Sequence, residues 1–77
     1  MKGFKVTYFF DENYYIRRFI LLDSQEAAEE LIQSERDRYI SFRDSRGIYH
    51  ELNTGDVRVI QISEYQRIDK SKKSNKP

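Results

Sequence analysis

Apolar and polar residues alternate along most of this chain, which is the pattern of strands that bury one face. The first run extends from Lys2 to Phe10 and places four side chains on its expected core face: Phe4, Val6, Tyr8 and Phe10. Three polar residues at 11–13 form a turn signal. The second run, from Tyr14 to Leu22, is partly apolar on both faces, so we expect a strand that is central, covered on both sides, or part of an interface.

The period changes from that of a strand to that of a helix after Leu22. Asp23 and Glu26 have the spacing of a capping box, in which the first side chain accepts from the backbone N–H of the second and the second reaches back. The following residues separate into an apolar stripe and a polar side, Ala27, Ala28, Leu31 and Ile32 against Glu29, Glu30 and Gln33. This spacing predicts an amphipathic helix that fades over 34–37.

Three short apolar runs separated by two turn signals occupy residues 39–64. The first turn, at 44–47, reads Asp-Ser-Arg-Gly and predicts a tight hairpin, because Asp can bond the backbone and Gly can adopt positive φ. The second turn lies at 53–56. The last run departs from strict alternation, which predicts a bulge near Val59 or a strand buried on both faces. We therefore expect a three-stranded meander.

The predicted order of elements is strand, strand, helix, strand, strand, strand, or ββαβββ. The simplest packing for this order is an α+β fold, in which a small antiparallel sheet of about five strands carries one amphipathic helix on one face. A partly closed small barrel with one helix is the alternative. Residues 1–65 are expected to form a single domain, because a chain of 77 residues has room for one core.

Charge is distributed unevenly along the chain. Residues 66–77 carry five basic residues and one acidic residue, and we expect them to be a disordered basic tail. Residues 1–65 carry nine basic and twelve acidic residues, so this part is net negative. Five of those acids, with no base among them, lie at 23–35, which predicts an acidic helix beside a mildly basic sheet.

Residue types that several chemistries require are missing or isolated. The chain has no cysteine and one histidine, His50, so a zinc site cannot be completed, and its three glycines form no phosphate-binding loop. We expect His50 to be a half-buried strand residue bonded to a backbone group or to a tyrosine. We therefore predict no enzymatic activity, no cofactor, no metal and no small-molecule substrate.

The localisation expected from the sequence is cytoplasmic. A cysteine-free chain fits a reducing compartment. The start of the chain has no pattern of a signal peptide, and the longest unbroken apolar run, 19–22, is far shorter than a membrane span. We accordingly expect no membrane partner.

The sequence suggests one candidate interaction face, formed by side chains that the alternation directs away from the helix: Tyr15, Arg17, Phe19, Tyr39, Arg43 and Tyr49. Aromatic residues and arginine are enriched at protein interfaces, including those of homodimers. The same residue types can stack nucleic-acid bases and attract phosphates, with the lysine-rich tail as a tether. Cross-strand Tyr and Arg pairs are also common on exposed sheets that bind nothing.

Two magnitudes decide between the functional alternatives. Leaving Phe19 and its apolar neighbours exposed would forgo roughly 1.5 to 3 kcal/mol for each side chain. A nucleic-acid groove normally has a basic excess, whereas residues 1–65 are net negative. We therefore favour a non-enzymatic protein-interaction module, self-associating or docking on a protein partner. A nucleic-acid-binding domain is the alternative.

Overall fold

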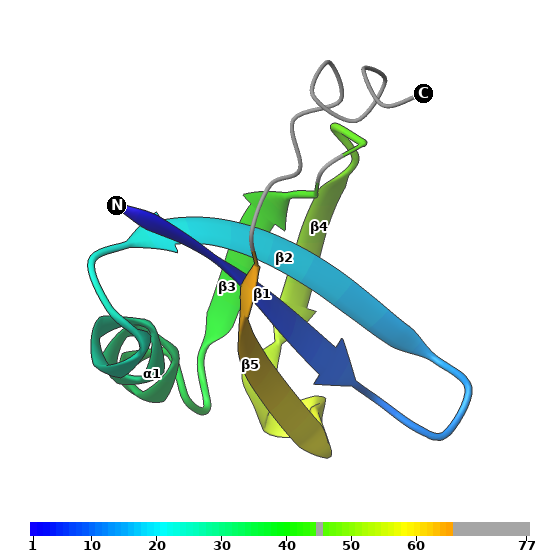
Figure 1. The fold of residues 1–77 in the computed structure, drawn as a ribbon. Helices are drawn as coiled ribbons and strands as arrows, with labels where there is room; N and C mark the ends of the chain where they lie inside the picture. The colour runs from blue at the N-terminus through cyan, green and yellow to red at the C-terminus, as the bar shows by residue number, and fades with distance from the viewer. Residues whose placement is uncertain (45, 66–77) are drawn as a thin grey trace.

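The structure is a computed structural model of the chain, and it describes residues 1–44 and 46–65 (Figure 1). These residues form five strands and one α-helix, in the order β1 (Lys2–Phe9), β2 (Tyr15–Leu22), α1 (Gln25–Ser34), β3 (Tyr39–Arg43), β4 (Tyr49–Asn53) and β5 (Val59–Tyr65). The predicted α+β class and the order ββαβββ are confirmed. The basic tail predicted at 66–77 lies outside the described residues.

The strands are divided between two antiparallel sheets. Sheet A has the order β2-β1-β5, and sheet B is the β3–β4 hairpin. The last strand returns to the first, with Ile62 opposite Val6, and is not a neighbour of β4. The meander predicted for 39–64 is therefore wrong in its third strand, which pairs with β1 and not with β4. The five strands form a three-stranded and a two-stranded sheet where a single sheet was predicted. The described strands do not close into a barrel.

Thr54 explains why the chain leaves sheet B after β4. Its hydroxyl donates to the carbonyl oxygen of Glu35 at 2.8 Å and accepts from the N–H of Arg38 at 2.9 Å. Its own N–H donates to the carbonyl oxygen of Arg38, also at 2.9 Å. A 3-10 turn at Thr54–Asp56 follows directly. These bonds tie the end of β4 to the segment after the helix and send the chain toward β1.

The core lies between one face of sheet A and a layer made of α1 and the hairpin. Phe4, Val6 and Tyr8 of β1 are completely buried in it. Ile32 of α1 and Leu52 of β4 meet them from the other layer. In Figure 1, β3 and β4 cross behind β1 and β2. The ring of Phe42 on β3 stacks on the ring of Tyr8, with centroids 6.0 Å apart. We call this side of sheet A its inner face.

The helix begins one residue later than the predicted capping box requires. The N-cap is Ser24, whose hydroxyl accepts from the N–H of Ala27 at 3.1 Å. Ser24 is a strong N-cap residue, and its use places Glu26 one position too early to reach back as the partner of a capping box. The apolar stripe was predicted correctly, since Ala28 and Ile32 are the buried residues of α1.

The irregularity predicted near Val59 is present at the start of β5. The N–H of Arg58 donates to the carbonyl oxygen of Phe9 at 2.8 Å, although Val59 is the residue paired with Phe9. Two consecutive residues facing one residue is the arrangement of a β-bulge. As a result Val57 packs against the core, while Val59 is about half exposed.

Residues 1–44 and 46–65 contain no helix with both the length and the apolar character needed to cross a membrane.

Candidate interaction face

The outer face of sheet A is the side turned away from α1 and the hairpin. Register fixes its members, because Thr7 lies opposite Arg17 on β2 and opposite Gln61 on β5, and alternate residues of each strand point to the same side. The face consists of Gly3, Lys5, Thr7 and Phe9 of β1, Tyr15, Arg17, Phe19 and Leu21 of β2, and Val59, Gln61, Ser63 and Tyr65 of β5.

Two aromatic pairs lie at opposite ends of the outer face. Phe9 and Tyr15 are direct cross-strand partners with ring centroids 5.7 Å apart. The rings of Phe19 and Tyr65 are 5.0 Å apart although β1 runs between their strands. Leu21 extends the second pair and is 66% exposed. The face therefore presents apolar side chains at both ends.

Gly3 permits the contact across β1. A Cβ at this position would lie 3.0 Å from the carbonyl oxygen of Tyr65 and 3.4 Å from its ring. Tyr65 therefore uses space that a side chain on residue 3 would occupy. Gly3 lies within β1, where the absence of a side chain permits this close approach.

The centre of the outer face is polar and cationic. A hollow of about 560 Å³ lies between Lys5, Thr7, Arg17 and the polar side chains of β5. The guanidinium of Arg17 lies 5.1 Å from the centroid of the Tyr15 ring, within range of a cation–π interaction. Lys5 and Arg17 are the charged residues of the face, which includes no carboxylate.

The structure separates the six residues of the predicted face into two groups. Tyr15, Arg17 and Phe19 belong to the outer face of sheet A. The other three, Tyr39, Arg43 and Tyr49, lie on the hairpin, on the side away from the core. The single face was predicted for one continuous sheet. The hairpin instead stacks on the inner face of sheet A, so its exposed side points the other way.

Several residues of the outer face were not among the six predicted ones. Phe9 and Leu21 carried a signal, because both are apolar at positions that the alternation turns away from the core. Val59 and Tyr65 carried none, since their place depends on the pairing of β5 with β1.

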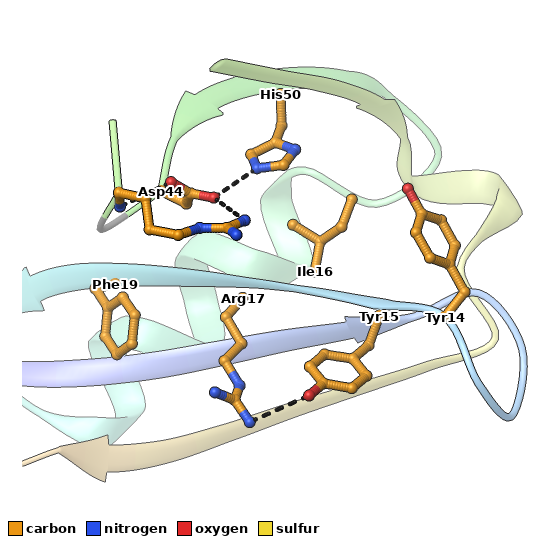
Figure 2. A pocket seen from close by; sticks show the side chains of 8 residues that line it. Tyr14, Tyr15, Ile16, Arg17, Phe19, Asp44 and His50 are labelled. Atoms are coloured by element: carbon orange, nitrogen blue, oxygen red, sulfur yellow. Dashed lines mark hydrogen bonds and ion pairs between the residues drawn. The ribbon is translucent and has the colours of Figure 1, made fainter. Parts of the chain in front are cut away.

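A second hollow, the edge groove, has a volume of about 600 Å³ and lies between β2 and the turn of the hairpin (Figure 2). Figure 2 shows His50 and Asp44 on one side of it and Tyr15, Arg17 and Phe19 on the other. Its lining includes Ile16 as well as Tyr15 and Arg17, so side chains from both faces of β2 contribute. A hollow lined in this way lies at the open edge of the strand.

Asp44 organises the hairpin turn on one side of the edge groove. Its Oδ1 accepts from the N–H groups of Arg46 at 2.9 Å and Ile48 at 3.0 Å. Its Oδ2 accepts from Arg46 Nη2 at 3.0 Å and lies 2.9 Å from His50 Nε2. The hydrogen bond with His50, followed by those from Arg46 and Ile48, holds the pKa of the Asp44 carboxyl well below its usual range. Gly47, at φ 84°, completes the turn.

His50 is half-buried as predicted, but its partner is the Asp44 carboxylate and not a backbone group or a tyrosine. The four contacts of Asp44 engage both of its oxygens, so this carboxylate anchors the turn. Residues 1–44 and 46–65 contain no cluster of three or more His, Asp or Glu side chains suited to a metal ion.

A polar cluster joins the layers on the inner face. Arg18 Nη1 donates to Glu35 Oε1 at 2.8 Å and to the hydroxyl of Tyr8 at 3.0 Å. Its guanidinium also lies 5.2 Å from the centroid of the Phe42 ring. Burial raises the pKa of the Tyr8 hydroxyl, against the opposing effect of the bond from Arg18. Arg18 thereby connects sheet A with the segment after α1 and with the hairpin.

Comparison of the chain with models of protein families, with curated proteins and with solved structures found no match. Functional inference for this protein therefore depends on its own residues and their geometry.

Proposed function

We propose that the protein is a non-enzymatic interaction module that docks on a protein surface through the outer face of sheet A. The observation that carries this proposal is the placement of two aromatic pairs and the exposed Leu21 on the face opposite α1 and the hairpin. Burying an aliphatic or aromatic side chain contributes roughly 1.5 to 3 kcal/mol, a large share of the stability of a small domain.

The charges of the outer face define the partner that it suits. Apolar side chains at the ends would meet apolar residues, and Lys5 with Arg17 at the centre would meet carboxylates. A second copy of the chain and a different protein are both partners of this kind. The acidic residues of α1, Glu26, Glu29 and Glu30, are exposed and give a second copy suitable carboxylates.

Analytical ultracentrifugation at micromolar concentration, together with binding of a hydrophobic dye, tests the proposal. We expect a concentration-dependent mass that Leu21→Ser and Tyr65→Ser lower. Tyr39→Ser removes an aromatic ring that is 79% exposed on the hairpin, and it serves as the matched control with no effect. A strict monomer whose dye binding is unchanged by Leu21→Ser would contradict the proposal.

Single-stranded nucleic acid is a second candidate partner, favoured by the position of Lys5 and Arg17 between the two aromatic pairs. The net negative charge of residues 1–65 argued against nucleic acid, but the acids do not lie on this face. Fluorescence anisotropy with single-stranded and duplex oligonucleotides at two salt concentrations tests it. We expect salt-sensitive binding that Arg17→Ala weakens, and absence of binding at low salt would exclude this candidate.

The cytoplasmic location predicted from the sequence is kept as part of the proposal. Fractionation of cells that express the tagged chain would test it, with the protein expected in the cytosolic fraction.

A further inference from the structure

Within residues 1–44 and 46–65, no strand pairs with the side of β2 that faces away from β1. β2 is an edge strand of sheet A, with β1 as its neighbour. At the turn between β1 and β2, the N–H of Phe10 donates to the carbonyl oxygen of Tyr14 at 2.9 Å. The pairing continues in the same register along both strands. Even-numbered residues of β2 therefore bond β1. The N–H and C=O groups of the odd-numbered residues, from Tyr15 to Leu21, point to the open edge.

The opposite edge of sheet A, formed by β5, has a hydrogen-bond partner in the helix. By the same alternation the even-numbered residues of β5 face its free edge, and the carbonyl oxygen of Ile62 accepts from Gln25 Nε2 of α1 at 3.3 Å. The helix thus supplies a partner to the edge of β5. Proteins commonly cover sheet edges or interrupt them with proline, because open edges recruit further strands. β2 has eight residues and no proline.

The edge groove provides space beside the open backbone of β2. A strand added at hydrogen-bonding distance would lie about 4.8 Å from β2, between the turn of the hairpin and the outer face (Figure 2). Arg17 and the exposed Arg46 are the cations that line this groove. Among the described residues, the carboxylate in this lining is that of Asp44, which accepts four hydrogen bonds. One of them comes from Arg46, so these two charges offset each other and Arg17 supplies the excess positive charge. The groove therefore suits an occupant with negative side chains.

We propose that an extended, acidic peptide segment of a partner protein adds to the edge of β2 as a fourth strand of sheet A. Main-chain hydrogen bonds to the odd-numbered residues of β2 supply affinity, and alternate side chains supply specificity. Side chains on the outer side carry carboxylates toward Arg17. Side chains on the inner side are apolar and lie toward Ile16. This site shares Tyr15, Arg17 and Phe19 with the outer face, but it uses the backbone edge of β2 and does not require the proposed docking function.

A second copy of the chain is a less suitable occupant than a single peptide segment. In an antiparallel pairing of two β2 edges that continues sheet A, each copy keeps its hairpin against the same side of the joint sheet. The turn at Asp44 of each copy would then compete for the groove that the other copy needs. An isolated strand brings no such turn.

The test uses two probes, an acetylated and amidated hexapeptide of alternating glutamate and valine and its lysine–valine counterpart. Each is titrated into the full chain at up to millimolar concentration, and amide hydrogen exchange is followed by NMR. We expect the glutamate peptide to slow exchange of the amides of Tyr15, Arg17 and Phe19 by about tenfold or more. We expect no such protection from the lysine peptide.

Two sets of variants connect the protection to the edge of β2. Phe19→Pro removes an outward N–H and should abolish binding. Phe19→Ala shortens a side chain that lines the groove but keeps that N–H, so it should weaken binding far less. Glu64→Pro removes an outward N–H from the opposite edge and is the matched control. Arg17→Glu, which changes no backbone group, should transfer the preference to the lysine peptide.

Three results would overturn the proposal. In the first, neither peptide binds at millimolar concentration. In the second, the peptide shifts NMR resonances of the outer face but does not slow exchange of the amides of β2. Alternatively, those amides are protected without peptide in a manner that depends on protein concentration, which would identify a second copy as the occupant. The docking proposal is tested separately by Leu21→Ser, so failure of one proposal is distinguishable from failure of the other.

Discussion

The two faces of sheet A are built from the same three strands, yet they differ in how their side chains are used. On the inner face Tyr8 is completely buried and Arg18 bonds two partners, Tyr8 and Glu35. On the outer face, the sequence neighbours of these residues are Phe9, which is partly exposed, and Arg17, which is exposed. The polar contact of Arg17 with the Tyr15 hydroxyl is 3.5 Å long. The comparison indicates that the inner face stabilises the fold, whereas the outer face contributes less to it.

The neighbouring aromatic residues Tyr8 and Phe9 give the largest expected contrast. Tyr8→Ala should lower the free energy of unfolding by about 3 to 5 kcal/mol, because it opens a cavity in the core and removes a partner of Arg18. Phe9→Ala should cost about 1 kcal/mol, since its ring packs on Tyr15 at the surface. Urea denaturation measures both values. Equal losses would show that the two faces are equally buried in solution.

The neighbouring arginines give the next contrast. Arg18→Ala should lower the free energy of unfolding by about 2 to 3 kcal/mol, because it leaves the Glu35 carboxylate without its partner. Both side chains are largely buried, with exposures of 14% for Arg18 and 20% for Glu35. Arg17→Ala should change stability by no more than about 0.5 kcal/mol. In a double-mutant cycle, Arg18→Ala combined with Glu35→Ala should cost less than the sum of the single changes. Additive losses would contradict a direct interaction.

Alternation along the sequence was sufficient to assign the faces of β1 and β2 but not the partners of the strands. Phe4, Val6 and Tyr8 were placed on the core face, and all three are buried. A period of two identifies which side chains share a face, whereas the choice between β1 and β4 as the neighbour of β5 depends on contacts distant in sequence. Thr54 also bonds to residues 35 and 38 at the point where the chain leaves sheet B, and no local pattern reveals these contacts.

The candidate site was predictable to the same extent. Tyr15, Arg17 and Phe19 were placed on an outward face from their own strand, and the structure places them there. Tyr39, Arg43 and Tyr49 were grouped with them because one sheet was assumed, and stacking of the hairpin separates the groups. The edge groove could not be predicted, because it forms where two sheets meet.

The hairpin that covers the inner face should lose stability in acid through Asp44. Its folded pKa is lowered, so its contribution is complete above the unfolded value near 4 and is lost as pH falls toward the folded value. Urea denaturation between about pH 2 and pH 6 should therefore show the advantage of the wild type over Asp44→Asn growing as pH rises, then levelling above about pH 5.

His50 provides the control for this pH dependence, because its hydrogen bond is the largest cause of the lowered pKa of Asp44. In a His50→Ala background, Asp44→Asn should remove a smaller part of the acid sensitivity than in the wild type. An unchanged difference in that background would assign the effect to Arg46 and to the backbone N–H groups of the turn.

The smallest expected effect compares Ile20 with Leu21. Ile20 packs against the core, and Ile20→Thr should cost about 2 kcal/mol. Leu21→Thr should change stability by no more than about 0.5 kcal/mol in the monomer, because Leu21 lies on the outer face. Urea denaturation at low and high protein concentration distinguishes folding from association, since association adds stability that increases with concentration. A cost of Leu21→Thr that appears at high concentration alone would mean that a second copy covers the outer face. A large cost at every concentration would mean that the two faces of sheet A do not differ as the structure indicates.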